Sequence, residues 1–250
     1  MVIARFRVFA TIAVASALQL HIKAGPDGRS VGDCPFAHAV RICCEAKQLQ
    51  VEVLPHGPMN KPQWLVDDYG GKMPALVSDD GEVVTESRVI VSWLEGYCAK
   101  PQLEGLPNQE VAEQVAGPVF GAFARYCKST STADDAEDKE KKKALLLALC
   151  NLDSHLQQTG QFMAGAQLST VDAFLLPALF HIRVAGAAYK DFEIPFVFDA
   201  LHQYMDRHLA SPIVSKCTPS EAMVRWGWAN ARDDTEAADT AKAELDGAMA

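Results

Sequence analysis

Residues 18–47 read LQLHIK (18–23), a loop with several glycines, and DCPFAHAVRICCEAK (33–47). The first segment alternates apolar and polar side chains, which predicts a half-buried strand. In the second segment a cysteine stands one residue before a proline. Proline is favoured at the first position of a helix, because its missing N–H would be unpaired there. We therefore expect a strand, a loop and a helix whose N-terminal cap is Cys34.

The chain up to Tyr97 continues to alternate between strands and helices. Helical segments are predicted at 61–69 and 86–97, and short apolar strands at 51–54, 75–77 and 82–84. Pro55 is expected to break the first of these strands, and Asp79-Asp80-Gly81 marks a hairpin turn between the other two. The resulting order is strand, helix, strand, helix, strand, strand, helix. This order is typical of a thioredoxin-like domain with a mixed four-stranded sheet.

The second half of the chain is predicted to be entirely helical. Residues 98–107 contain two prolines and a glycine, which indicates a linker. Candidate helices follow at 111–127, 141–158, 170–187 and 196–209. Ser169 and Asp172 form a variant of the capping box before a very apolar helix, which we expect in the buried centre of this domain.

These patterns divide the chain into five parts. We expect an extension or targeting segment at 1–17, an α/β domain at 18–97, the linker at 98–107, an all-α domain at 108–230 and an acidic, solvated tail at 231–250. The apolar run 8–20, which spans the end of the extension and the start of the first strand, is too short to cross a membrane as a helix. No stable membrane association is therefore expected.

Composition excludes several functional classes. The 250 residues are 49% hydrophobic and 22% charged, as in a folded globular protein, and the net charge of −9 argues against nucleic-acid binding. Seven cysteines are present, with no CxxC pair. This odd number without regular spacing argues against a disulfide framework, a dithiol motif and a zinc site, and favours a reducing intracellular compartment.

Cys34 is the strongest candidate for chemistry. The positive end of a helix favours a thiolate over a thiol, whereas the alternative is a buried, inert cysteine. A negative charge on Asp33 should oppose ionisation of the thiol. Alanine at position 37 means that no neighbouring cysteine can resolve a disulfide, so resolution needs a second thiol molecule. Cys43 and Cys44 are expected in the core.

The motifs taken together resemble the glutathione transferase superfamily, and within it the glutathione-dependent dehydroascorbate reductases of plants and algae. The resemblance runs from about Leu18 to Asn230. It rests on Lys23-Ala24, Gly32-Asp33-Cys34-Pro35-Phe36, Lys61-Pro62-Gln63-Trp64, Gly71-Lys72-Met73-Pro74, Glu86-Ser87, Phe162-Met163-Ala164-Gly165, Ser169-Thr170-Val171-Asp172, Leu179-Phe180-His181 and Gly227-Trp228-Ala229. It departs from the family at Ala37, usually serine, and at Glu86, more often aspartate.

The resemblance implies a thioredoxin-like domain joined to a helical domain, and antioxidant recycling of ascorbate. It implies Cys34 as nucleophile, and glutathione as co-substrate without a bound metal or other cofactor. Dehydroascorbate would contact Lys23, Asp33, His181 and Trp228, with the last two lining its pocket and Phe36 at the mouth. Glutathione would contact Lys61, Lys72, Met73, Pro74, Glu86 and Ser87, with a cis Met73–Pro74 bond exposing the Met73 backbone.

Two other functions share this fold. One is an omega-type glutathione transferase that acts as a thioltransferase, and the other is a membrane-inserting protein of the chloride-intracellular-channel kind. We expect a monomer in the cytosol, or in the chloroplast or another organelle if residues 1–17 are a targeting segment.

Overall fold

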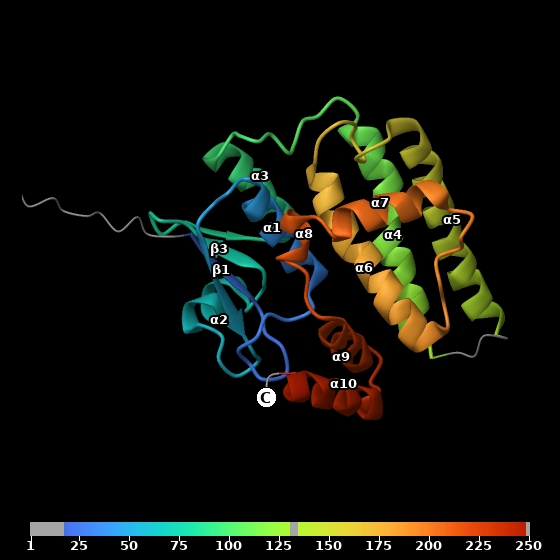
Figure 1. Ribbon diagram of the computed structural model, residues 1–250. Helices are drawn as coiled ribbons and strands as arrows, with labels where there is room; N and C mark the ends of the chain where they lie inside the picture. Colours follow the sequence, from blue (N-terminus) through green and yellow to red (C-terminus); the bar gives the residue numbers. More distant parts are fainter. Residues whose placement is uncertain (1–17, 131–134, 249–250) are drawn as a thin grey trace, which may run out of the picture.

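A computed structural model describes residues 18–130 and 135–248, so the expectation for 1–17 lies outside the described residues. The first half of the described chain alternates strands with helices in the predicted order (Figure 1). Its elements are β1 (Leu18–Lys23), α1 (Pro35–Ala46), β2 (Val51–His56), α2 (Gln63–Tyr69), β3 (Ala75–Val77), β4 (Val83–Thr85) and α3 (Ser87–Tyr97).

The four strands form one mixed sheet in the order β2-β1-β3-β4. β1 pairs parallel to β2 through the α1 crossover and antiparallel to β3, and β3 pairs antiparallel to β4. β2 extends through Pro55 to His56, so the predicted break at Pro55 is wrong. β2 is an edge strand, where a proline lacking an N–H can be accommodated.

The second half consists of helices. They are α4 (Gln109–Lys128), α5 (Ala136–Thr159), α6 (Thr170–Lys190), α7 (Asp199–Leu209), α8 (Pro212–Ser215), α9 (Glu221–Ala231) and α10 (Thr235–Ala248). α4, α5 and α6 run side by side, and α6 also packs against α1 of the first half (Figure 1). α5 begins earlier than predicted because the Asp135 side chain caps it, accepting a hydrogen bond from the Glu137 N–H at 2.9 Å.

The capping box at the start of α6 is confirmed and is fully buried. The Asp172 carboxylate accepts hydrogen bonds from the Ser169 N–H (2.9 Å), the Met163 N–H (2.8 Å) and the Tyr204 hydroxyl (2.8 Å). α6 is long and apolar enough to cross a membrane, but 78% of its apolar window is buried inside the fold. Its apolar character is accounted for by its position at the centre of the helical half.

Lys47, the residue after α1, binds the linker to the first domain through hydrogen bonds and an ion pair. The buried ammonium group donates to the Cys98 carbonyl (2.7 Å) and the Pro101 carbonyl (2.8 Å), and forms an ion pair with Glu95 at 2.9 Å. Cys43 and Cys44 on the same helix are buried, as predicted.

The acidic end of the chain differs from its prediction. We expected a solvated tail from residue 231, but Thr235–Ala248 forms α10, which packs along α9 and buries Ala238 and Ala241. An ion pair joins Arg225 of α9 to Glu244 of α10. The tail therefore supports α9, a helix that our sequence analysis also missed and that contacts the candidate site.

Candidate active site

Cys34 occupies the predicted cap of α1. Its backbone is extended, Pro35 takes the first helical position, and the Cys34 carbonyl accepts the first helical hydrogen bond from the His38 N–H at 3.0 Å. The sulfur therefore lies at the end of a helix that presents free N–H groups, as the sequence indicates.

Burial nevertheless raises the pKa of the Cys34 thiol. The N–H groups of Ala37 and Phe36 lower this pKa, as does the positive charge of Lys23, while the negative charge of Asp33 raises it further. The helix terminus lowers the pKa of Cys34 and Asp33 raises it, each in the expected direction. Desolvation of the sulfur outweighs the helix terminus, so the pKa of Cys34 is raised overall, and the stabilised thiolate stays a prediction.

Lys23 and Asp33 form an ion pair beside the nucleophile. The distance from Lys23 Nζ to Asp33 Oδ1 is 2.8 Å, and the lysine side chain is 46% exposed whereas the aspartate side chain is 11% exposed. The Lys23 ammonium also lies over the ring of Trp226, 5.3 Å from its centroid. Trp226 was not among our candidate residues, since nothing near it in the sequence marks it as a partner of Lys23.

His181 and Trp228 lie together but are almost completely buried, with exposures of 1% and 5%. The Trp228 indole N–H donates to His181 Nδ1 at 2.9 Å, and both rings contact Phe120. Burial lowers the pKa of His181 to about 4, although the Asp33 carboxylate partly opposes this decrease. The two residues therefore form a buried layer near Asp33 and do not form an open pocket wall.

The residues predicted to bind glutathione gather where β3 begins and β4 ends. The Met73–Pro74 bond is cis, as predicted. Ala75 pairs with Thr85, so the residues before β3 lie beside those after β4. The Lys72 ammonium pairs with the exposed Glu86 carboxylate at 3.1 Å.

Two further members of this set flank the pair. Ser87 opens α3, whose free N–H groups can hold an anion. The Lys61 ammonium donates to the Gly71 carbonyl at 2.9 Å and so supports the turn before Met73. Together these groups offer the backbone before a cis proline, a helix terminus and two ammonium groups.

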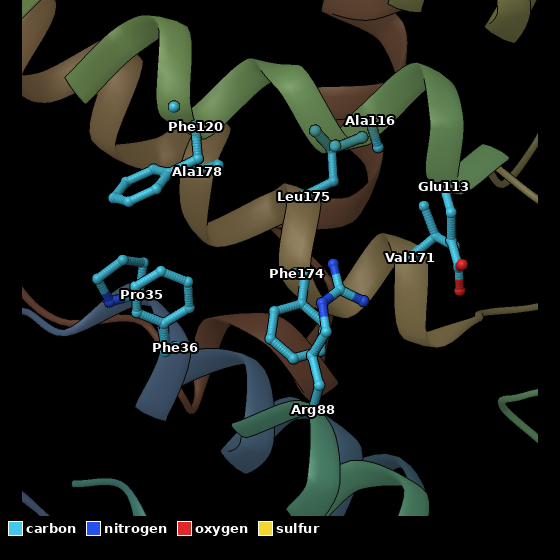
Figure 2. Close-up of a pocket in the computed structure, with 12 residues that line it drawn as sticks. Pro35, Phe36, Arg88, Glu113, Ala116, Phe120, Val171, Phe174, Leu175 and Ala178 are labelled. Atoms are coloured by element: carbon cyan, nitrogen blue, oxygen red, sulfur yellow. The ribbon is translucent and has the colours of Figure 1, made fainter. Parts of the chain in front are cut away.

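A cavity of about 250 Å³ lies between the two halves of the molecule, and Pro35 and Phe36, which follow Cys34, line it (Figure 2). Phe36 meets Phe120 across it with ring centroids 5.5 Å apart, and the Arg88 guanidinium lies 4.5 Å from the Phe174 centroid. The lining is otherwise mostly apolar and comes from α1, α3, α4 and α6. Lys23, Asp33, His181 and Trp228 are not among its lining residues.

The cavity joins the start of α1 to the start of α3, and therefore joins the region of Cys34 to the region of Ser87.

Within residues 18–130 and 135–248, no cluster of three or more histidine, cysteine, aspartate or glutamate side chains is arranged to hold a metal ion. The chemistry that these groups support is that of a thiol held near an ion pair.

Comparison with known proteins identifies related domains in both halves. Residues 33–96 match the glutathione S-transferase N-terminal domain, and residues 144–207 match the glutathione S-transferase C-terminal domain. Over 200 residues the chain is 33% identical to glutathione S-transferase DHAR2 of Arabidopsis thaliana, covering 79% of this chain and 90% of that protein. Over 228 residues it is 28% identical to the chloroplastic glutathione S-transferase DHAR3 of the same plant, covering 90% and 84%.

Solved structures show the same relationship. The dehydroascorbate reductase of Chlamydomonas reinhardtii superposes with a TM-score of 0.76 at 29% identity, over 86% of this chain and 99% of that one. The CLIC homologue EXC-4 of C. elegans superposes with a TM-score of 0.70 at 21% identity, over 86% and 85% of the two chains, which shows a shared fold.

Proposed function

Because the chain belongs to the dehydroascorbate reductases of the glutathione transferase superfamily, we propose that it reduces dehydroascorbate to ascorbate with two molecules of glutathione. The observation that carries this proposal is the placement of Cys34 at the start of α1, beside the Lys23–Asp33 ion pair. A thiol next to both a cation and an anion can attack a small polar electrophile and exchange protons with it.

The proposed reaction has three covalent steps. The Cys34 thiolate first bonds to a carbonyl carbon of dehydroascorbate. A glutathione thiolate then attacks the Cys34 sulfur, so that an S–S bond forms while the C–S bond breaks and its electron pair leaves with the product as ascorbate. A second glutathione thiolate attacks the glutathione sulfur of this mixed disulfide, releasing glutathione disulfide and regenerating Cys34. Two thiols are oxidised and one dehydroascorbate is reduced.

The single ion pair beside Cys34 supports roles for both of its members. Lys23 is partly exposed and lowers the pKa of Cys34, so it is suited to binding the substrate oxygens and stabilising the thiolate. Asp33 is suited to a hydrogen bond or a proton transfer with the substrate. His181 and Trp228 would form the buried layer behind this dehydroascorbate site.

Glutathione would bind where β3 begins and β4 ends. The Met73 backbone, exposed before Pro74, would pair with the cysteinyl backbone of glutathione as an added strand. The γ-glutamyl carboxylate would lie at Ser87 and the start of α3, near Glu86. Lys61 and Lys72 would face the glycyl carboxylate and neighbouring groups.

The proposed setting is a reducing intracellular compartment, either the cytosol or an organelle such as the chloroplast, where the enzyme would act as a monomer. The seven free cysteines agree with such a compartment. Expression of the full chain fused to a fluorescent protein, followed by microscopy, would locate it.

The decisive experiment compares Cys34→Ser with the matched control Cys150→Ser, since Cys150 is an exposed free thiol on α5. Initial rates of ascorbate formation from dehydroascorbate and glutathione are measured, together with the intact mass after treatment with glutathione disulfide. We expect C34S to lose both turnover and the glutathione adduct, and C150S to retain turnover. A C34S enzyme that still forms ascorbate at the wild-type rate would refute the proposal.

A second candidate function is supported by the apolar cavity beside Pro35 and Phe36. An omega-type thioltransferase would use the same thiol to remove glutathione from mixed disulfides, and an apolar partner group would fit the largely apolar lining. Comparing kcat/KM for dehydroascorbate with kcat/KM for a small aromatic glutathione disulfide separates the two. A higher value for the disulfide would favour the thioltransferase.

A further inference from the structure

Three consecutive residues of α9 contact three different residues of the proposed dehydroascorbate site. We call Trp226-Gly227-Trp228 the α9 tripeptide. Its members contact, in order, Lys23, Asp33 and His181. A helix that meets the site at each of three successive positions is placed to set the geometry of that site.

Gly227 makes the closest of these approaches. A β-carbon at this position would lie 1.7 Å from Asp33 Oδ2 and 2.1 Å from Asp33 Cγ. Glycine is one of the least favourable residues within a helix, so α9 itself gains nothing from it. The Asp33 carboxylate occupies the space that any other side chain at position 227 would fill, and it therefore lies directly against the backbone of α9.

Trp228 determines which nitrogen of His181 carries the proton. An indole N–H can only donate, so His181 Nδ1 must accept, and the neutral imidazole then carries its proton on Nε2. The lowered pKa of His181, about 4, keeps the ring neutral near pH 7. Nε2 is buried without a hydrogen-bond partner in the part of the chain that the structure describes. The Asp33 backbone and carboxylate each raise the pKa of His181, which shows that the ring lies close to Asp33.

Trp226 contacts Lys23, the other member of the ion pair. The Lys23 ammonium lies 5.3 Å from the centroid of the Trp226 ring and 2.8 Å from the Asp33 carboxylate. A cation over a tryptophan face is attracted by the negative potential of the ring. These two contacts restrict the orientation of the ammonium group, while the lysine side chain stays partly exposed to solvent.

α9 is itself held by its neighbours. The Ser220 side chain caps its start, accepting from the Met223 N–H at 3.2 Å. The Tyr189 hydroxyl of α6 donates to the Arg225 carbonyl at 2.7 Å, immediately before the tripeptide, and the Arg225 side chain pairs with Glu244 of α10. The tripeptide is thus attached to α6 and α10, outside the first domain.

We propose that the α9 tripeptide is a positioning element that fixes the directions of Lys23, Asp33 and His181 beside Cys34. His181 and Trp228 then act through Asp33, as their burial requires, and do not touch dehydroascorbate. The effect of this element on turnover rests on the proposed function, but its effect on the His181 tautomer does not.

The test uses two variants with matched controls. Gly227→Ala adds a methyl group against Asp33, whereas Gly96→Ala adds one to a helix with no atom within 4 Å. We expect kcat/KM for dehydroascorbate to fall about 100-fold in G227A, the loss typical of a displacement of about 1 Å in a site, and G96A to match the wild type. A G227A enzyme that loses no more activity than G96A would overturn the proposal.

Trp228→Phe keeps a large aromatic ring and removes the N–H, and Trp93→Phe removes an indole N–H bonded to exposed Glu82. Ring ¹³C and ¹⁵N shifts, assigned with His181→Gln, report the tautomer without turnover. We expect Nε2–H alone in the wild type and W93F, and both tautomers in W228F with kcat/KM about fivefold lower. An unchanged tautomer in W228F would refute the inference even if G227A fails to fold. A wild type that lacks activity but shows the fixed tautomer would refute the proposed function alone.

Discussion

Replacing Asp33 with asparagine should make the Cys34 thiol more acidic. The carboxylate raises the pKa of Cys34, and it also holds the Lys23 ammonium at 2.8 Å, although the charge of Lys23 lowers that pKa. Asparagine has nearly the same shape, removes the repulsion and releases Lys23 from its counter-charge. Both changes favour the thiolate, so they act in the same direction.

The size of the effect follows from this arrangement. A charge within ~4–6 Å of an ionisable group shifts its pKa by about 1–3 units. The 46% exposure of the Lys23 side chain shows that water screens the site, so the lower end, ~1 unit, applies. Below the pKa this raises the thiolate fraction about tenfold. Lower basicity reduces the nucleophilicity of each thiolate about threefold, for a Brønsted coefficient of ~0.4–0.5. The net rate at pH ~7 should therefore rise roughly threefold to fourfold.

The assay is the rate of iodoacetamide alkylation against pH without glutathione, followed by mass spectrometry of the Cys34 peptide. Glu45→Gln on the distant end of α1 is the control, because it also removes a carboxylate from the helix. Turnover of dehydroascorbate by D33N should fall, since the proposed substrate contact is lost. A Cys34 pKa that stays constant or rises in D33N would refute the electrostatic reasoning.

Three other perturbations have defined outcomes. Lys23→Met should raise the pKa of Cys34 and slow its alkylation at neutral pH, measured in the same titration. Lys47→Met leaves the partly buried Glu95 carboxylate and two carbonyl groups without their cation, so urea denaturation should show a loss of about 3–5 kcal/mol in the free energy of unfolding. A loss below ~1 kcal/mol would contradict this assignment. Burial lowers the pKa of His38 to about 3 and of His181 to about 4. The unfolded chain therefore binds more protons than the folded protein below pH ~6.5. As the pH is lowered from ~6.5 towards 4, the free energy of unfolding should decrease by up to ~1.4 kcal/mol per pH unit for each histidine. Urea midpoints that do not change over this range would exclude the effect.

Local sequence patterns were sufficient for the first domain. The alternation at 18–23, the cysteine before Pro35 and the hairpin turn before β4 each act over a few residues, and the structure confirms the order of elements they predict. The capping box at Ser169 was predictable for the same reason. The extension of β2 through Pro55 was not, because only the position of a strand at the sheet edge permits it.

The end of the chain was harder to predict because its signal is weak. The residues that α10 buries, Ala238 and Ala241, are alanines, and a small apolar face among acidic residues looks the same as a solvated tail in the sequence. What stabilises this helix is packing on α9, including the pair between Arg225 and Glu244. Contacts between two helices of this kind cannot be predicted from the hydrophobic periodicity of the sequence.

The same limit applies to the site. The helix terminus at Cys34 could be predicted from Pro35, but the net pKa depends on how far the fold desolvates the sulfur. The contact of Lys23 with Trp226 joins opposite ends of the chain, so no local pattern reveals it. The pairing of Lys72 with Glu86 also arises only when β3 and β4 are paired.

The contacts of α9 with the first domain also determine when the site is completed during synthesis. Lys23, Asp33 and Cys34 leave the ribosome long before Trp226-Gly227-Trp228 is made. Until α9 docks, Asp33 has no helix backbone behind it and Lys23 has no ring above it. A nascent chain that has not reached α9, or one truncated before it, therefore carries the nucleophile without its assembled surroundings, and the reactive site becomes complete only after α9 has been translated.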